Sequence, residues 1–237
     1  MAPGRVARMR IYEAAPEGPA RGGVIVIQEA FGVNEHIEDV TRRFAAVGYH
    51  AVAPALYHRQ GDPVFDYGKF DGIMEVMAQL SDDAFMEDLD AACETLHERC
   101  IEDPSIGAVG FCMGGRVSFL LAVNRAIGAS VGFYGGGIVT ERAPQFPALV
   151  GRVSELKTPW LGLFGDEDGS IPVADVERLR GELAAHAPVD TDVVRYAGAK
   201  HGFHCDRRPD YDEHAAKDGW QRTLAWFEKY LAPTKAG

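Results

Sequence analysis

The stretch Gly110-Phe111-Cys112-Met113-Gly114-Gly115 decides the fold of this chain, because it joins two elements of different type. A run of small and apolar residues, 106–111, leads into it, as in a strand that is buried on both faces. Residues 116–126 are good helix formers with apolar side chains at helical spacing. The stretch therefore predicts a strand, a tight turn and a helix, with Cys112 at the centre of the turn.

A Gly-x-nucleophile-x-Gly turn between a strand and a helix is the nucleophile elbow of the α/β-hydrolases. The flanking glycines are needed because a Cβ there would clash with the neighbouring strand or helix, and the central residue is strained. Cys112 would lie at a helix N-terminus, whose dipole favours the reactive thiolate. The alternative is a buried structural cysteine. The glycine spacing fits neither the Rossmann pattern nor a P-loop.

Length, charge and composition limit the class of protein. The chain has 237 residues, of which 46% are hydrophobic, and we expect one α/β domain over residues 1–237. Its formal net charge of −11 argues against a nucleic-acid partner. No apolar run approaches the roughly 20 residues of a membrane span, and no signal peptide is evident. We therefore expect a cytoplasmic protein with no membrane partner.

The four cysteines, Cys93, Cys100, Cys112 and Cys205, have spacings that suggest no disulfide framework, which fits a reducing compartment. The roles of the other three beside Cys112 stay open. Predicted strands alternate with predicted helices along the whole chain, which indicates a mostly parallel central sheet with helices on both faces, in three layers. The predicted strands are 8–13, 23–27, 49–54, 106–111, 127–134, 159–164 and 191–197, and the predicted helices are 35–47, 81–99, 116–126, 173–186 and 212–231.

Three kinds of side chain follow predicted strands in the order nucleophile, acid, base, which is the order of this fold. Cys112 comes first, then the acidic loop 166–168, then His201. The carboxyl ends of parallel strands share one edge, where open α/β sheets bind ligands. Cys112 would attack a carbonyl carbon, His201 would transfer the proton, and an aspartate would orient the imidazole. Either aspartate of this loop could instead cap the next helix.

Other histidines and cysteines offer weaker alternatives. His204 competes with His201 for the role of base but is placed at most in the pocket wall. Metal sites at His201, His204 and Cys205, or along one helix face at 93, 97 and 100, are possible by spacing, but a core-facing helix edge explains the second set. We expect no metal and no cofactor.

Five stretches resemble the dienelactone hydrolase family, the carboxymethylenebutenolidases. They are residues 26–34 (VIQEAFGVN), 53–57 (APALY), 110–115 (GFCMGG), 133–135 (FYG) and 201–203 (HGF). The resemblance covers nearly the whole chain. It implies an α/β-hydrolase that acts on carboxylic esters or lactones without metal or organic cofactor, with Cys112 as nucleophile and His201 as base. It favours Asp168 as the acid, because the family reads Gly-x-x-Asp-x-x-Val/Ile-Pro.

The resemblance also implies roles for residues around the triad. A glutamate at the place of Glu29 takes part in activating the thiol, although a loop-anchoring carboxylate is the alternative. Ala30 and Met113 would supply the two oxyanion N–H groups, and the substrate pocket would include the aromatic residues of the matching stretches, Phe31, Tyr134 and Phe203. From the family we expect a monomer. An acyltransferase or thioesterase-like enzyme on the same site, and a non-catalytic thiol sensor, are the alternative functions.

The chain departs from the family at the residues that hold a substrate carboxylate. The family member that opens dienelactone uses two arginines. One comes four residues after the histidine, where this chain has Cys205, and residues 71–79 offer no arginine in place of the other. Lys69, Arg59 or Arg207 could substitute. A lost charge-assisted contact of about 1.5–3 kcal/mol puts dienelactone itself in doubt as the substrate.

Overall fold

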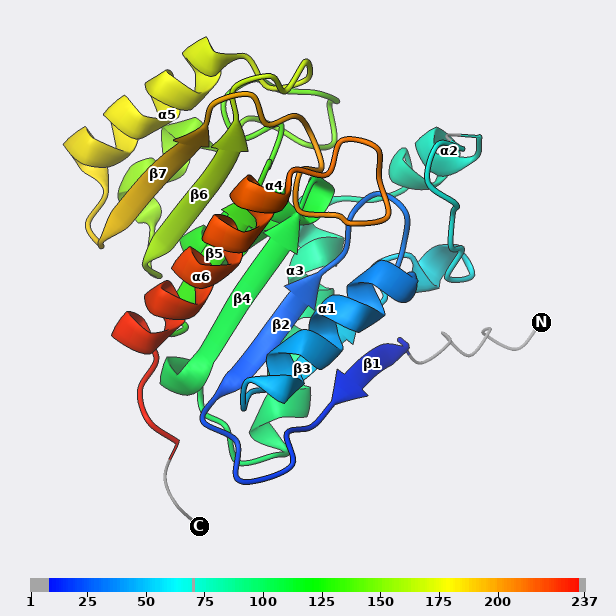
Figure 1. Ribbon diagram of the computed structural model, residues 1–237, viewed down its shortest axis with the longest axis vertical. Coiled ribbons are helices and arrows are strands. Elements are labelled where there is room, and N and C mark those ends of the chain that lie inside the picture. Colours follow the sequence, from blue (N-terminus) through cyan, green and yellow to red (C-terminus); the bar gives the residue numbers. More distant parts are fainter. Residues whose placement is uncertain (1–8, 70, 235–237) are drawn as a thin grey trace.

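Seven strands form one sheet through the centre of the computed structural model, which describes residues 9–69 and 71–234 (Figure 1). Their order is β1-β3-β2-β4-β5-β6-β7, and only the pairing of β1 with β3 is antiparallel. The bounds are β1 Ile11–Ala14, β2 Gly23–Ile27, β3 His50–Pro54, β4 Ile106–Phe111, β5 Ala129–Phe133, β6 Trp160–Gly165 and β7 Thr191–Tyr196. The predicted start of the first strand, Arg8, and the expected absence of a signal peptide concern residues outside the described ones.

Helices cover both faces of the sheet, as predicted. α1 (Glu35–Ala46) and α6 (Glu213–Tyr230) cover one face (Figure 1). The other face carries α3 (Asp82–His97) and α4 (Met113–Asn124), with α5 (Val173–His186) packed beside the short helix η3 (Val150–Glu155). The predicted three-layer α/β arrangement is therefore confirmed. Four short helices of the described residues were not predicted: α2 (Ile73–Met77), η1 (His58–Gln60), η2 (Asp103–Ser105) and η3.

Side-chain caps begin α1 and α3. The Asn34 side chain accepts a hydrogen bond from the Ile37 N–H at 3.1 Å, and Ser81 accepts one from the Ala84 N–H at 3.2 Å. Such a side chain satisfies a backbone donor that has no partner within the helix. These caps explain why both helices begin within one residue of the predicted positions.

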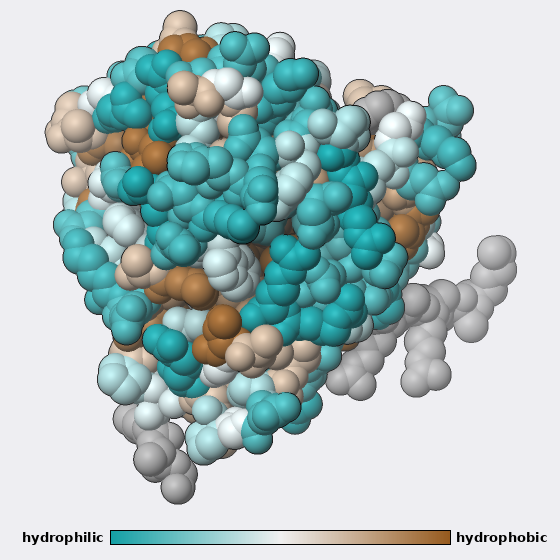
Figure 2. All heavy atoms as spheres, in the orientation of Figure 1, coloured by the Kyte–Doolittle hydropathy of each residue, from teal (hydrophilic) through white to brown (hydrophobic). Residues whose placement is uncertain are grey.

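The core lies on both sides of the central strands. Every residue of β2, β3, β4, β5 and β6 is buried, whereas the edge strand β7 is partly exposed. This explains why the inner strands read as continuous apolar runs and β7 does not. The outer face over α1 and α6 is mostly hydrophilic, with hydrophobic side chains in small separate areas (Figure 2). None of the helices in the described part combines the length and apolarity needed to cross a bilayer.

The carboxyl ends of the parallel strands meet at one edge of the sheet, beside α2 and the loop that precedes α6 (Figure 1). The segments that follow β2, β4, β6 and β7 begin there. These segments carry Glu29, Cys112, Asp168 and His201. The topology thus brings the predicted site residues to the same edge.

Candidate active site

Cys112 lies in the turn between β4 and α4 with φ 55° and ψ −115°. Its N–H donates a hydrogen bond to the Phe133 carbonyl at 3.0 Å. A Cβ on Gly110 would lie 1.8 Å from the Gly114 carbonyl oxygen, and one on Gly114 would lie 2.4 Å from the Ile27 carbonyl oxygen. Side chains therefore cannot replace these glycines without moving backbone, and the close packing holds Cys112 in its left-handed conformation. The predicted strand, tight turn and helix are confirmed.

Asp168 and His201 form a direct hydrogen bond. Oδ2 of Asp168 is 2.7 Å from Nδ1 of His201, and the aspartate side chain is almost fully buried. Oδ1 accepts two further hydrogen bonds from Ser170, at 2.8 Å from its N–H and 2.7 Å from its hydroxyl. Burial raises the pKa of Asp168, but the bonds from His201 and Ser170 outweigh it and hold the pKa below its ordinary value. Asp166 points to Arg195 instead, at 2.6 Å.

The His201 imidazole lies between the Asp168 carboxylate and the Cys112 sulfur. Burial lowers the pKa of His201, but the charge and hydrogen bond of the Cys112 sulfur, together with those of Asp168, raise it to about 10. A histidine with this pKa carries a proton at neutral pH. The arrangement therefore favours an imidazolium beside the Cys112 sulfur.

Glu29 is fully buried and lies two residues after the end of β2. Its Oε2 accepts a hydrogen bond from the Tyr67 hydroxyl at 2.9 Å, and its Oε1 lies 3.5 Å from Nη1 of Arg208. The backbone here is held by Gln28, whose Oε1 accepts a hydrogen bond from the Leu56 N–H at 3.1 Å. The carboxylate thus has one hydroxyl donor and one cationic partner.

Sequence reasoning missed Arg208. Its guanidinium lies 5.9 Å from the ring centre of Phe31 and 6.0 Å from that of Tyr67, and its side chain is only 13% exposed. The three cations considered from the sequence are all paired elsewhere: Arg59 with Asp88 and Glu87, Lys69 with Asp66, and Arg207 with Glu35. The only signal for Arg208 in the sequence was its position seven residues after the predicted base.

A cavity of about 240 Å³ contains the reactive side chains. Cys112 and His201 line it together with Ala30 and Met113, the residues predicted for the oxyanion N–H groups. Most of the remaining wall is apolar and comes from α2, α3, α4 and the loop after β5: Ile73, Met74, Met77, Phe85, Arg116, Val117, Gly136, Gly137, Arg142 and Phe146. The cavity therefore offers an electrophilic carbonyl a place beside Cys112 and a largely dry surrounding.

Phe31, Tyr134 and Phe203 were predicted for the substrate pocket. They lie near His201 or the Glu29 partners but do not line the cavity. The Tyr134 ring centre is 5.1 Å from that of His201, and its buried hydroxyl has no hydrogen-bond partner among the described residues. Phe203 is fully buried, 5.1 Å from the Tyr134 ring. Phe31 packs edge-on against Tyr67 at 4.7 Å. Phe203 thus packs against Tyr134, the neighbour of His201, and Phe31 packs against Tyr67, the donor to Glu29.

His204 lies in the core and does not reach Asp168. Its ring centre is 4.9 Å from that of Phe111 and 6.0 Å from that of His36, and its Nδ1 has no hydrogen-bond partner among the described residues. Burial lowers its pKa to about 3, and burial also lowers the pKa of His36. Both rings are therefore neutral at neutral pH.

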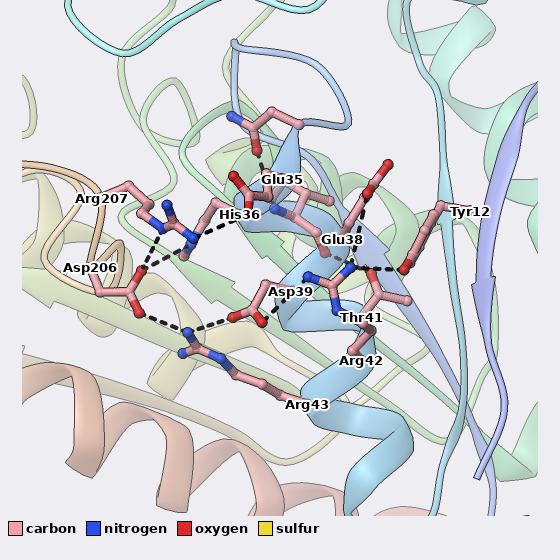
Figure 3. Close-up of polar contacts among 12 residues, drawn as sticks. Tyr12, Glu35, His36, Glu38, Asp39, Thr41, Arg42, Arg43, Asp206 and Arg207 are labelled. Atoms are coloured by element: carbon pink, nitrogen blue, oxygen red, sulfur yellow. Dashed lines mark hydrogen bonds and ion pairs between the residues drawn. The ribbon is translucent and has the colours of Figure 1, made fainter.

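Ion pairs connect α1 with the loop between β7 and α6, which carries His201 and His204. Asp206 pairs with Arg43 at 2.7 Å, and Arg43 also pairs with Asp39 one turn earlier on α1 (Figure 3). Asp206 also approaches Nδ1 of His36 at 3.6 Å. This network holds in place the segment between His201 and α6.

All four cysteines are free thiols. Burial raises the pKa of Cys93 to about 12 and that of Cys205 to about 11, so both are thiols at neutral pH. His97 pairs with Asp103 at 2.8 Å rather than joining Cys93 and Cys100, and α3 ends at His97, before Cys100. Within residues 9–69 and 71–234, no three His, Cys, Asp or Glu side chains are grouped so that they could hold a metal ion.

Comparison with known proteins identifies relatives over most of the chain. Residues 9–231 match the model of the dienelactone hydrolase family. A protein of Methylorubrum extorquens named "Putative carboxymethylenebutenolidase" is 41% identical over 218 residues, covering 90% of this chain and 75% of the relative. One of the same name from Salmonella typhimurium is 40% identical over 228 residues, covering 94% and 83%.

A crystal structure named "Putative Dienelactone Hydrolase", from Klebsiella pneumoniae, superposes with a TM-score of 0.86 at 39% identity. It covers 94% of this chain and 93% of that one. These matches confirm the resemblance and the α/β-hydrolase fold that the sequence predicted.

Proposed function

Since the chain belongs to the dienelactone hydrolase family, we propose that it hydrolyses carboxylic esters or lactones through Cys112, His201 and Asp168. The observation that carries this proposal is the grouping of three side chains, two of which line one cavity while the third bonds to the base. Asp168 is 2.7 Å from Nδ1 of His201, and His201 lines the same cavity as the strained Cys112. A nucleophile, a base and a group that orients the base are the requirements of covalent acyl transfer.

In the first half of the reaction the Cys112 sulfur attacks the carbonyl carbon, and the carbonyl π electrons move to the oxygen. The N–H groups of Met113 and Ala30 stabilise this oxyanion. When the tetrahedral intermediate collapses, the C–O bond breaks and the leaving alkoxide takes the proton of His201. The product is a thioester on Cys112, and in a lactone the alcohol stays attached to the acyl group.

In the second half a water molecule attacks the thioester. Neutral His201 accepts its proton while the oxygen adds to the carbonyl carbon, and Asp168 stabilises the imidazolium that forms. Collapse expels the Cys112 sulfur and releases the acid. The site then returns to the sulfur and imidazolium pair with which it began.

Glu29 takes part in activating the thiol. A carboxylate next to a thiolate repels it, and here Arg208 at 3.5 Å balances the Glu29 charge. A rearrangement of this pair on substrate binding changes the electrostatic field at the sulfur. Glu29→Gln should therefore lower kcat without removing the nucleophile.

The test compares the loss of the dienelactone chromophore with the hydrolysis of a small aryl ester, in wild type and in Cys112→Ala. We expect Cys112→Ala to abolish both reactions. Cys100→Ser is the matched control, because Cys100 is an exposed thiol outside the cavity, and it should retain wild-type rates. Unchanged ester hydrolysis in Cys112→Ala would show that the sulfur is not the nucleophile.

The two substrates also address the two family arginines that this chain lacks at the matching positions. Rapid opening of dienelactone by wild type would mean that other groups hold its carboxylate. Cleavage of only the aryl ester, still through Cys112, would indicate a different natural ester or lactone.

A further inference from the structure

We propose that Arg142 is a specificity-determining residue, which binds an anionic group on a substrate whose acyl part is otherwise apolar. This inference rests on the proposed hydrolase function and names the class of substrate for the same cavity. It depends on three features of the structure: the apolar wall, the state of the two arginines in that wall, and the open space around Arg142.

The apolar wall sets the size and polarity of the acyl group. Ile73, Met77, Phe85 and Phe146 line the cavity, and the rings of the last two stack at 5.7 Å. An apolar cavity of about 150 Å³ is large enough to hold benzene. The volume here, about 240 Å³, accommodates a ring or a chain of several carbon atoms beside Cys112.

Two arginines line this cavity, and one of them is already neutralised. Arg116 is nearly buried and makes a bidentate pair with Asp82 at 2.6 and 2.9 Å, and it also donates to the Pro147 carbonyl at 2.7 Å. Such a pair satisfies most of its donors and cancels its charge. Arg116 therefore belongs to the scaffold that supports the cavity wall.

Arg142 is exposed and donates to a backbone carbonyl, that of Ser170. Among the described residues it has no carboxylate partner. Most of the described arginines do pair with a carboxylate, as Arg10, Arg59 and Arg195 show. A guanidinium has five donors in a fork that matches a carboxylate, so those not used at Ser170 can bind a ligand.

The Arg142 side chain is exposed, so a ligand can reach it. Its guanidinium packs closely against Gly136, where a Cβ would come within 2.6 Å of Nη2. Arg142 lines the catalytic cavity on one side and, on the other, a neighbouring hollow of about 270 Å³ that also includes Thr140, Ser170 and Asp175. Because Arg142 borders the catalytic cavity, an acyl chain held by the apolar wall could bring an anionic group to its guanidinium.

A positioning role is the competing explanation, because Ser170 also holds Asp168. The two roles differ in what they change. Loss of positioning would slow every ester equally, whereas loss of ligand binding would slow only esters with an anionic group. The ratio of two matched substrates therefore separates them.

The experiment measures kcat/KM at low salt for mono(4-nitrophenyl) adipate and for its neutral isostere, 4-nitrophenyl 6-methylheptanoate. We expect wild type to prefer the anionic ester by about tenfold, and added salt to reduce the preference because Arg142 is exposed. Arg142→Gln should abolish the preference and leave the rate for the neutral ester within about twofold of wild type, and Arg142→Lys should retain part of it.

Arg152→Gln is the matched control, because Arg152 pairs with Glu155 on η3 and does not line the cavity. An unchanged ratio in Arg142→Gln, or an equal loss for both esters, would overturn the inference while leaving the hydrolase function intact. Cleavage of neither ester by wild type, or undiminished cleavage by Cys112→Ala, would overturn the proposed function and this inference with it.

Discussion

Arg208→Gln should destabilise the protein, because it removes the cationic partner of a fully buried carboxylate. Glu29 and Arg208 approach to 3.5 Å, and at an effective dielectric constant of about 20 two unit charges at this distance attract by about 5 kcal/mol. Removal of one partner from a buried pair costs about 3–5 kcal/mol. Tyr67 continues to donate to Glu29, so we expect a loss near the lower limit, about 3 kcal/mol.

A double-mutant cycle isolates the pair. Glu29→Gln alone should cost about 1 kcal/mol, since the partly exposed Arg208 retains access to water. The double variant leaves no buried charge unpaired and should lose only about 2 kcal/mol, less than the sum of the single losses. The resulting coupling free energy is about 2 kcal/mol.

Urea unfolding at pH 7.5, followed by tryptophan fluorescence and circular dichroism, gives each free energy of unfolding. Arg207→Gln is the matched control, because this adjacent arginine is exposed and pairs with an exposed Glu35, and it should change stability by less than about 0.5 kcal/mol. Equal losses in the two arginine variants, or additive losses in the cycle, would refute the reasoning.

Three further predictions concern the triad, the core and the elbow. Asp168→Asn should lower kcat by about 10³–10⁴-fold in ester hydrolysis, whereas Asp166→Asn should retain most of it, since only Asp168 contacts the base. Burial lowers the His204 pKa to about 3. As the pH falls, His204 therefore binds a proton in the unfolded chain before it does so in the folded protein. Between pH 6 and 4 stability should fall about 1.4 kcal/mol per pH unit faster than in His204→Phe, measured by urea midpoints. Gly114→Ala should unfold the protein or cost at least about 3 kcal/mol, because its Cβ would lie 2.4 Å from a backbone oxygen of β2. Gly181→Ala, on α5 where a Cβ would have open space, should leave stability unchanged or raise it. Thermal melts of both glycine variants measure the two effects.

Local patterns in the sequence were sufficient to predict the parallel sheet, its covering helices and the turn that holds Cys112. The elbow at 110–115 is encoded by glycines whose neighbours leave no space for a Cβ, and the caps Asn34 and Ser81 bond to the backbone three residues away. Alternating strands and helices imply a parallel sheet, and that sheet brings the carboxyl ends of its strands to one edge. The placement of Cys112 and His201 at that edge follows from these short-range signals alone.

Only the tertiary structure determines which groups contact the site residues and the charged side chains around them. Sequence alone could not distinguish Arg207 from Arg208, yet one is paired on the surface and the other contacts a buried carboxylate 179 positions earlier. The same holds for Arg142, whose unpaired charge in the cavity wall depends on loops that only packing brings together. The short helix α2 is also beyond sequence patterns, because five residues give too little periodicity to recognise. Backbone conformation depends on near neighbours, whereas the partner of a charged side chain depends on which distant segments the fold places beside it.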